Sequence, residues 1–142
     1  ETNEPDASEH VEQDAQGECR HMKRYEKYPK IMVMSNCGFP EMSHFQVVQL
    51  LFQRIARNMH SQVIAEIYRP AGEILRHKNP ALLPFLLPYK KLLKKVGKAI
   101  VEQGAIPDDL QEKLNKPLIP EAMYIKVANQ NFSKMLEKLE KE

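Results

Sequence analysis

Apolar residues first cluster at positions 31–34 of this chain, and small and polar residues follow directly. The run Ile31-Met-Val-Met34 leads into Ser35-Asn-Cys-Gly-Phe-Pro40. A short apolar run bounded by turn residues is typical of a buried strand, so we expect a strand over residues 30–35. Residues 43–59 then divide into an apolar and a polar face at helical spacing. The apolar face of this expected helix consists of Phe45, Val48, Leu51, Phe52, Ile55 and Met59.

The next segments complete a strand–helix–strand pattern. Ser43 and Gln46 have the spacing of a capping box, which predicts that the helix starts at Ser43. The apolar run Val63-Ile-Ala-Glu-Ile-Tyr68 predicts a second strand. Two strands joined through a helix are expected to pair in parallel. Because open parallel sheets bind ligands beyond the carboxyl ends of their strands, residues 35–41 are the candidate site.

Prolines and glycines divide the rest of the chain into helices. Asn79-Pro80 predicts the start of a long helix that ends at Gly104, and Pro88 is expected to kink this helix or to mark its true start. Pro107 and Pro120 predict the starts of a short helix and of a last helix. The last helix carries an apolar stripe that consists of Tyr124, Ala128, Phe132, Met135 and Leu139.

The long helix has an apolar first half, residues 81–89, followed by a face rich in lysine. The lysines of this face are Lys90, Lys91, Lys94, Lys95 and Lys98. Such a pattern fits a core helix with solvated lysines, a dimer interface or an element that lies on a membrane surface. Residue types alone leave these three alternatives open.

Composition and charge indicate one globular domain with an acidic start. Of the 142 residues, 42% are apolar and 28% are charged, as in an ordinary soluble domain. Residues 1–19 carry seven carboxylates and no lysine or arginine, so the rest of the chain carries about +9. We expect residues 1–22 to form an acidic, disordered linker or loop. The basic part lacks interleaved aromatic residues, and no apolar run could span a bilayer, so neither nucleic-acid nor membrane binding is expected.

Two cysteines make a disulfide scaffold impossible and favour a cytoplasmic location. Cys19, His21 and His10 lack the four ordered ligands of a structural metal site, so no metal is expected. Cys37 and His44 would form a Cys/His nucleophilic pair without a third orienting group, and a lone cysteine is more often a small buried hydrophobe. We therefore expect no catalytic side chain in this chain.

The segment Ser35-Asn-Cys-Gly-Phe-Pro-Glu-Met-Ser-His-Phe45 resembles the loop after the fourth strand of the flavodoxin-like NAD(P)H-dependent FMN reductases. The segment Ala65-Glu-Ile-Tyr-Arg-Pro-Ala-Gly-Glu-Ile-Leu75 resembles the fifth strand of this family and the turn that follows it. Two further stretches, residues 24–31 and 116–124, resemble the same family. The resemblance covers roughly residues 20–136.

This resemblance implies a doubly wound sheet of strand order 2-1-3-4-5 that holds FMN at its carboxyl edge. It also implies an oxidoreductase in which NAD(P)H delivers a hydride to the flavin, which passes it to an acceptor. The expected cofactor-binding residues are Ser35, Asn36, Cys37, Gly38, Phe39 and Glu41. The residue types fit this role, because Gly38 permits close approach of a ligand and Phe39 offers a flat apolar surface. They equally fit a tight turn that needs glycine and proline for its geometry alone.

The phosphate-binding loop and the aromatic-glycine loop of this family have no counterpart in the chain. The resemblance therefore implies an α/β protein with a partial flavodoxin-like parallel sheet and additional C-terminal helices. Residues 23–142 would form the carboxyl-terminal half of the domain. We expect such a half to bind FMN weakly or not at all alone, and to pair with a missing amino-terminal half or form a homo-oligomer. The alternative is a truncated, non-catalytic module that acts through dimerisation or partner binding.

Overall fold

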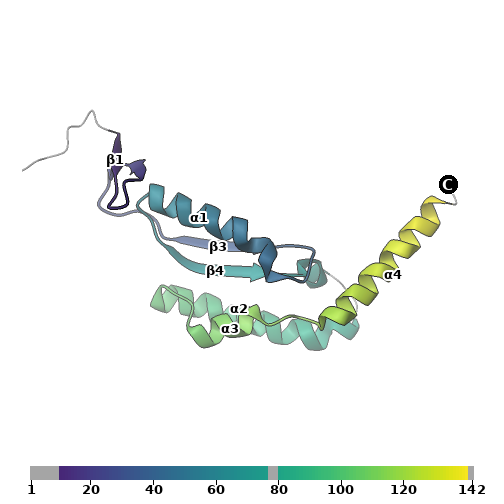
Figure 1. Ribbon diagram of the computed structural model, residues 1–142. Helices are drawn as coiled ribbons and strands as arrows, with labels where there is room; N and C mark the ends of the chain where they lie inside the picture. Colours follow the sequence, from purple (N-terminus) through teal and green to yellow (C-terminus); the bar gives the residue numbers. More distant parts are fainter. Residues whose placement is uncertain (1–9, 77–79, 141–142) are drawn as a thin grey trace, which may run out of the picture.

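The computed structural model describes residues 10–76 and 80–140 and shows a mixed α/β arrangement (Figure 1). Its helices are α1 (Gln46–Asn58), α2 (Leu83–Gln103), α3 (Asp108–Asn115) and α4 (Glu121–Leu139). Its strands are β1 (Val11–Gln13), β2 (Cys19–His21), β3 (Ile31–Asn36) and β4 (Val63–Arg69). Short 3-10 helices, η1 (Met42–Phe45), η2 (Gly72–Arg76) and η3 (Pro80–Leu82), lie between them. The predicted α/β class and the additional C-terminal helices are confirmed.

Strands β3 and β4 pair in parallel, as the strand–helix–strand pattern predicts. The register places Ser35 opposite Tyr68 and Asn36 opposite Arg69, so the two strands end together. Their shared carboxyl edge is the position at which open α/β sheets bind ligands. The candidate loop therefore leaves the sheet at the place where the sequence predicts a site.

Helical layers cover both faces of this strand pair, α1 on one face and α2 with α3 on the other (Figure 1). Under α1, Val33, Phe45 and Tyr68 form a buried cluster, with the rings of Phe45 and Tyr68 stacked at 5.0 Å between centroids. Because neighbouring strand residues point to opposite faces, Ile67 packs on the other side. The buried cluster there consists of Ile67, Tyr89, Val96 and Leu114.

Strand β3 and helix α1 carry apolar side chains that the other described residues leave exposed. Met32 and Met34 are 50% and 63% exposed, and Val47 and Leu50 of α1 are 77% and 57% exposed. Leu51, which the periodicity predicts to pack on the sheet, is also half exposed. A two-stranded parallel sheet has no third strand against which such residues can pack, and this explains the exposure.

The helix starts differ from those that the sequence predicts. Ser43 lies inside η1 and α1 begins only at Gln46, with no side-chain hydrogen bond at its N-cap, so the predicted capping box is wrong. The long helix begins at Leu83, because the preceding turn is a 3-10 turn and Pro84 occupies the first helical turn, where its missing N–H costs nothing. Pro88 lies within α2 and does not mark its start. Asn79 lies outside the described residues.

Glycine 104 ends α2 as predicted, with a left-handed φ of 70°. The predicted helices after Pro107 and Pro120 are confirmed as α3 and α4. Helix α4 projects away from the body, and most of its apolar side chains are exposed (Figure 1). No helix among residues 10–76 and 80–140 has the length and apolar character that a membrane crossing requires.

Strands β1 and β2 form an antiparallel hairpin within the segment that the sequence predicts to be a disordered linker. The carboxylate of Asp14 accepts hydrogen bonds from the backbone N–H groups of Gln16 and Glu18 at 3.0 Å, which closes the turn. Asp14 and Glu18 also form ion pairs with Arg57 and Arg54 of α1. These contacts span about forty residues of sequence, so local composition does not reveal them. The predicted domain boundary after residue 22 stays a prediction.

Candidate functional site

The candidate loop begins at the carboxyl end of β3 and is held against the segment that follows β4. The N–H of Cys37 donates to the carbonyl of Arg69 at 3.3 Å, which continues the sheet pairing by one residue. The N–H of Gly72 donates to the carbonyl of Cys37, and the N–H of Ala71 donates to that of Phe39, both at 2.8 Å. Backbone hydrogen bonds thus fix the loop in place over the end of the sheet.

Two N–H groups of this loop point away from the groups that bind the neighbouring carbonyls. The described peptide bonds are all trans, and a trans peptide holds its C=O and N–H on opposite sides. The carbonyl of Cys37 faces Gly72, so the N–H of Gly38 points away from it. The carbonyl of Gly38 accepts a hydrogen bond from the hydroxyl of Tyr124 at 2.5 Å, so the N–H of Phe39 points away from α4. The loop therefore has two adjacent N–H donors that are directed away from Gly72 and from Tyr124.

The ring of Phe39 forms an exposed flat surface beside these donors. It is 63% exposed and stacks on the imidazole of His44, with 5.2 Å between ring centroids and 23° between planes. The Nε2 atom of His44 lies 3.2 Å from Oε2 of Glu41. Glu41 therefore orients the imidazole that supports one face of Phe39, and its own carboxylate is half exposed.

The remaining expected site residues lie on different faces of the sheet. Ser35 is half-buried on the α1 face, whereas Asn36 is exposed on the opposite face, because strand residues alternate. The thiol of Cys37 is partly buried and donates to the carbonyl of Phe39 at 3.3 Å. Four of the six expected residues therefore face solvent: Asn36, Gly38, Phe39 and Glu41.

Gly72 allows the two strand exits to approach closely. A Cβ atom at this position would lie 2.6 Å from Cβ and 2.9 Å from Oδ1 of Asn36, closer than real contacts allow. The sequence pattern Arg69-Pro-Ala-Gly72 indicates a turn but does not reveal this contact, which depends on the register of β3 and β4.

Arg69 is a residue of this edge that sequence reasoning missed. Its side chain is 3% exposed, and its three guanidinium nitrogens have no hydrogen-bond partner among the described residues. The guanidinium carbon lies 5.0 Å from the ring centroid of Tyr89, over its face. Burial lowers the pKa of Arg69, and burial also raises the pKa of Tyr89. The sequence contains one signal that could have pointed to this residue, namely an arginine at the end of an apolar strand.

The other clusters that the sequence singles out are not assembled into sites. No group of three metal-ligating side chains occurs within the described ranges, which include Cys19, His21 and His10. The Nδ1 atom of His10 lies 2.8 Å from a guanidinium nitrogen of Arg24 instead. His44 interacts with Glu41 and Phe39, and the thiol of Cys37 is directed to a backbone carbonyl.

The fold and the site together define a parallel βαβ unit with a donor-bearing loop at its carboxyl edge. Comparisons of the chain with protein-family models, curated proteins and solved structures returned no match. The resemblance to the FMN reductases therefore rests on the residues of the chain itself.

Proposed function

We propose that residues 23–142 form the carboxyl-terminal part of a flavodoxin-like, NAD(P)H-dependent FMN oxidoreductase. The observation that carries this proposal is the pair of adjacent N–H groups at Gly38 and Phe39, directed away from Gly72 and Tyr124, in a loop with an exposed aromatic ring at the carboxyl edge of a parallel βαβ unit. A flavin ring requires flat apolar cover and backbone donors toward its nitrogen and oxygen atoms. The loop supplies both.

The space beside Gly38 is open. A Cβ atom added at Gly38 would meet nothing within 4 Å, so the backbone there is open to a ring that approaches it. When bound, FMN supplies the hydride chemistry between NAD(P)H and an acceptor. The residues of this chain bind and orient the flavin, and none of them is assigned an acid, base or nucleophilic role.

The proposal includes a further segment that covers the outer edge of β3. Met32 and Met34 of β3, which are 50% and 63% exposed, are the surface against which it would pack. A third strand would also satisfy the unpaired backbone groups of that edge. In the proposed protein this segment is the amino-terminal half of the domain, which carries the phosphate-binding loop.

Titration of FMN fluorescence tests this function. We expect stoichiometric FMN in the polypeptide extended by whatever its reading frame encodes upstream of residue 1, and binding at least about 100-fold weaker by residues 1–142. In the extended protein, Gly38→Leu should lower FMN affinity at least about tenfold, because the added side chain enters the open space above the loop.

Val101→Leu is the matched control, because Val101 is 87% exposed on α2. An extended protein without flavin would refute the FMN assignment. A yellow preparation of residues 1–142 with one FMN per chain would refute the need for a second half.

The exposed surface at β3 supports a second candidate function, a non-catalytic module that self-associates. In that case residues 1–142 form a dimer whose melting temperature rises with protein concentration. Met34→Lys should then restore a monomer in light scattering, whereas Val101→Lys should not. A monomeric mass for the unaltered chain at all concentrations would exclude this candidate.

A further inference from the structure

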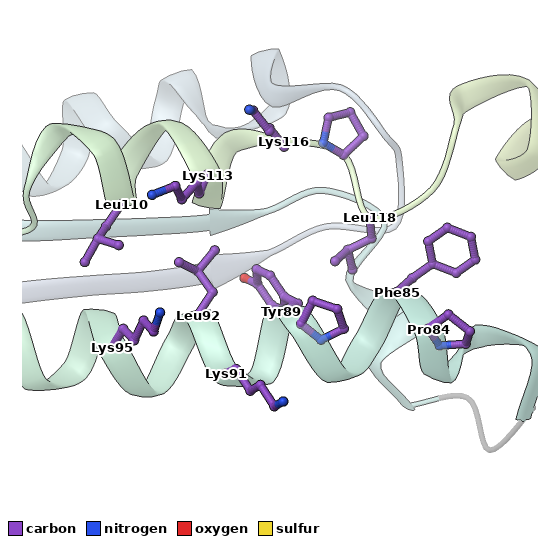
Figure 2. A pocket seen from close by; sticks show the side chains of 12 residues that line it. Pro84, Phe85, Tyr89, Lys91, Leu92, Lys95, Leu110, Lys113, Lys116 and Leu118 are labelled. Carbon is purple, nitrogen blue, oxygen red and sulfur yellow. The ribbon is translucent and has the colours of Figure 1, made fainter.

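A concave surface lies between α2, α3 and the segment that follows α3 (Figure 2). Its volume is about 590 Å³, which is in the range of small-molecule sites. Apolar side chains and prolines form most of its lining. These are Pro84, Phe85, Pro88, Tyr89, Leu92, Leu110, Pro117 and Leu118.

The other lining residues in the described part of the chain are four lysines: Lys91 and Lys95 of α2, Lys113 of α3, and Lys116 just after α3. Lys113 forms an ion pair with Asp109 at 2.8 Å, and Lys116 forms one with Glu112 of α3 at 3.5 Å. No ion pair joins Lys91 or Lys95 to a carboxylate within the described ranges. These two lysines are four residues apart, so they lie on one side of α2. The groove thus has a positive rim with two uncompensated charges.

A buried positive charge lies directly behind the apolar lining. Tyr89, which lines the groove, is in contact through its ring face with the guanidinium of Arg69. Arg69 has no hydrogen-bond partner in the described part of the chain and is almost fully buried. Because charges in the interior are weakly screened, this guanidinium adds to the positive potential of the groove.

We propose that this groove binds a single-chain amphiphilic anion, with its apolar chain along the lining and its carboxylate between Lys91 and Lys95. Among the described residues the lining has no acidic or amide side chain, so the hydroxyl groups of a sugar would find few partners there and would lose their hydration. An apolar chain needs no such partners, and an anionic head matches the rim. This inference does not depend on the proposed flavin site, which lies at the candidate loop.

Isothermal titration of residues 1–142 with decanoate tests the proposal. Saturable binding is expected, and it should weaken as salt is added because the contact is an ion pair at the surface. Decan-1-ol, which lacks the charge, and acetate, which lacks the chain, should each bind at least about tenfold more weakly. Equal binding of decanoate and decan-1-ol would overturn the assignment of an anionic head.

Matched double variants locate the head of the ligand. Lys91→Gln with Lys95→Gln should weaken decanoate binding at least about tenfold. Lys90→Gln with Lys94→Gln removes the same charge at the same spacing from α2, but neither residue lines the groove, so binding should change less than about twofold. Equal losses of decanoate affinity in the two double variants would mean that net charge alone drives binding, and this would overturn the assignment of the site.

A second pair of variants locates the apolar chain. Phe85→Ala should weaken binding, and Leu87→Ala should not, although both side chains are exposed on α2 and only Phe85 lines the groove. Circular dichroism checks that each variant keeps its helices. Binding to vesicles of anionic phospholipid without binding of free decanoate would overturn the proposal in favour of a membrane surface.

Discussion

Replacing Arg69 with methionine tests whether the buried guanidinium of this residue is uncompensated. The side chain is 3% exposed, and its three nitrogens have no hydrogen-bond partner within the described ranges. Methionine retains an unbranched apolar chain that can fill most of the same space. The variant therefore removes the charge, its unsatisfied donors and the cation–π contact with Tyr89, while an apolar chain continues to fill most of the space.

The expected change in the free energy of unfolding is a gain of about 1–3 kcal/mol. A buried polar group without a partner costs about 1–3 kcal/mol, and a charged group costs more. The cation–π contact of Arg69 with Tyr89, at 5.0 Å, stabilises the folded state by about 2 kcal/mol when it is desolvated. Several unsatisfied donors outweigh one such contact. For a chain of this length the gain corresponds to a rise of roughly 3–10 °C in the melting temperature.

Urea unfolding followed by circular dichroism measures this difference. Arg76→Met is the matched control, because Arg76 is exposed shortly after β4 and its replacement should change stability by less than about 0.5 kcal/mol. Removal of Arg69 should also raise the pKa of Tyr89 further, because the positive charge at Arg69 lowers that pKa. A loss of more than about 1 kcal/mol in Arg69→Met would show that the guanidinium has a stabilising partner and would refute the reasoning.

Three further predictions follow from particular contacts. Gly72→Ala should destabilise the protein by about 1–3 kcal/mol in urea unfolding, because its Cβ would overlap Asn36, and a second change, Asn36→Gly, should recover part of the loss. Gly104→Ala should cost about 1 kcal/mol in the same assay, because a side chain is strained at a φ of 70°. A hydrogen bond from Arg57 lowers the pKa of Asp14 below its ordinary 3.8, so the pair stabilises the docked β1–β2 hairpin above that pH and loses its effect as the pH falls through the lowered value. Asp14→Asn should therefore speed amide exchange in residues 11–21 at neutral pH, and unchanged exchange would contradict a role for this pair.

The sequence by itself determined the elements whose signals are local. The apolar run at residues 31–34 and the helical periodicity after it are sufficient to place β3, α1 and β4 and to predict their parallel pairing, which the structure confirms. Gly104 and the prolines at 107 and 120 mark helix ends by their own backbone preferences. The location of the candidate loop at the carboxyl edge follows from this topology. Its role as a flavin site stays a prediction.

Only the tertiary structure decided the features that depend on contacts between residues far apart in the sequence. The hairpin of β1 and β2 is held by ion pairs from Asp14 to Arg57, and the close approach of Gly72 to Asn36 depends on strand register. The burial of Arg69 and the groove between α2 and α3 depend on how helices pack over the sheet. The free energies of such contacts come from partners far apart in the chain, so no local pattern of residues can report them.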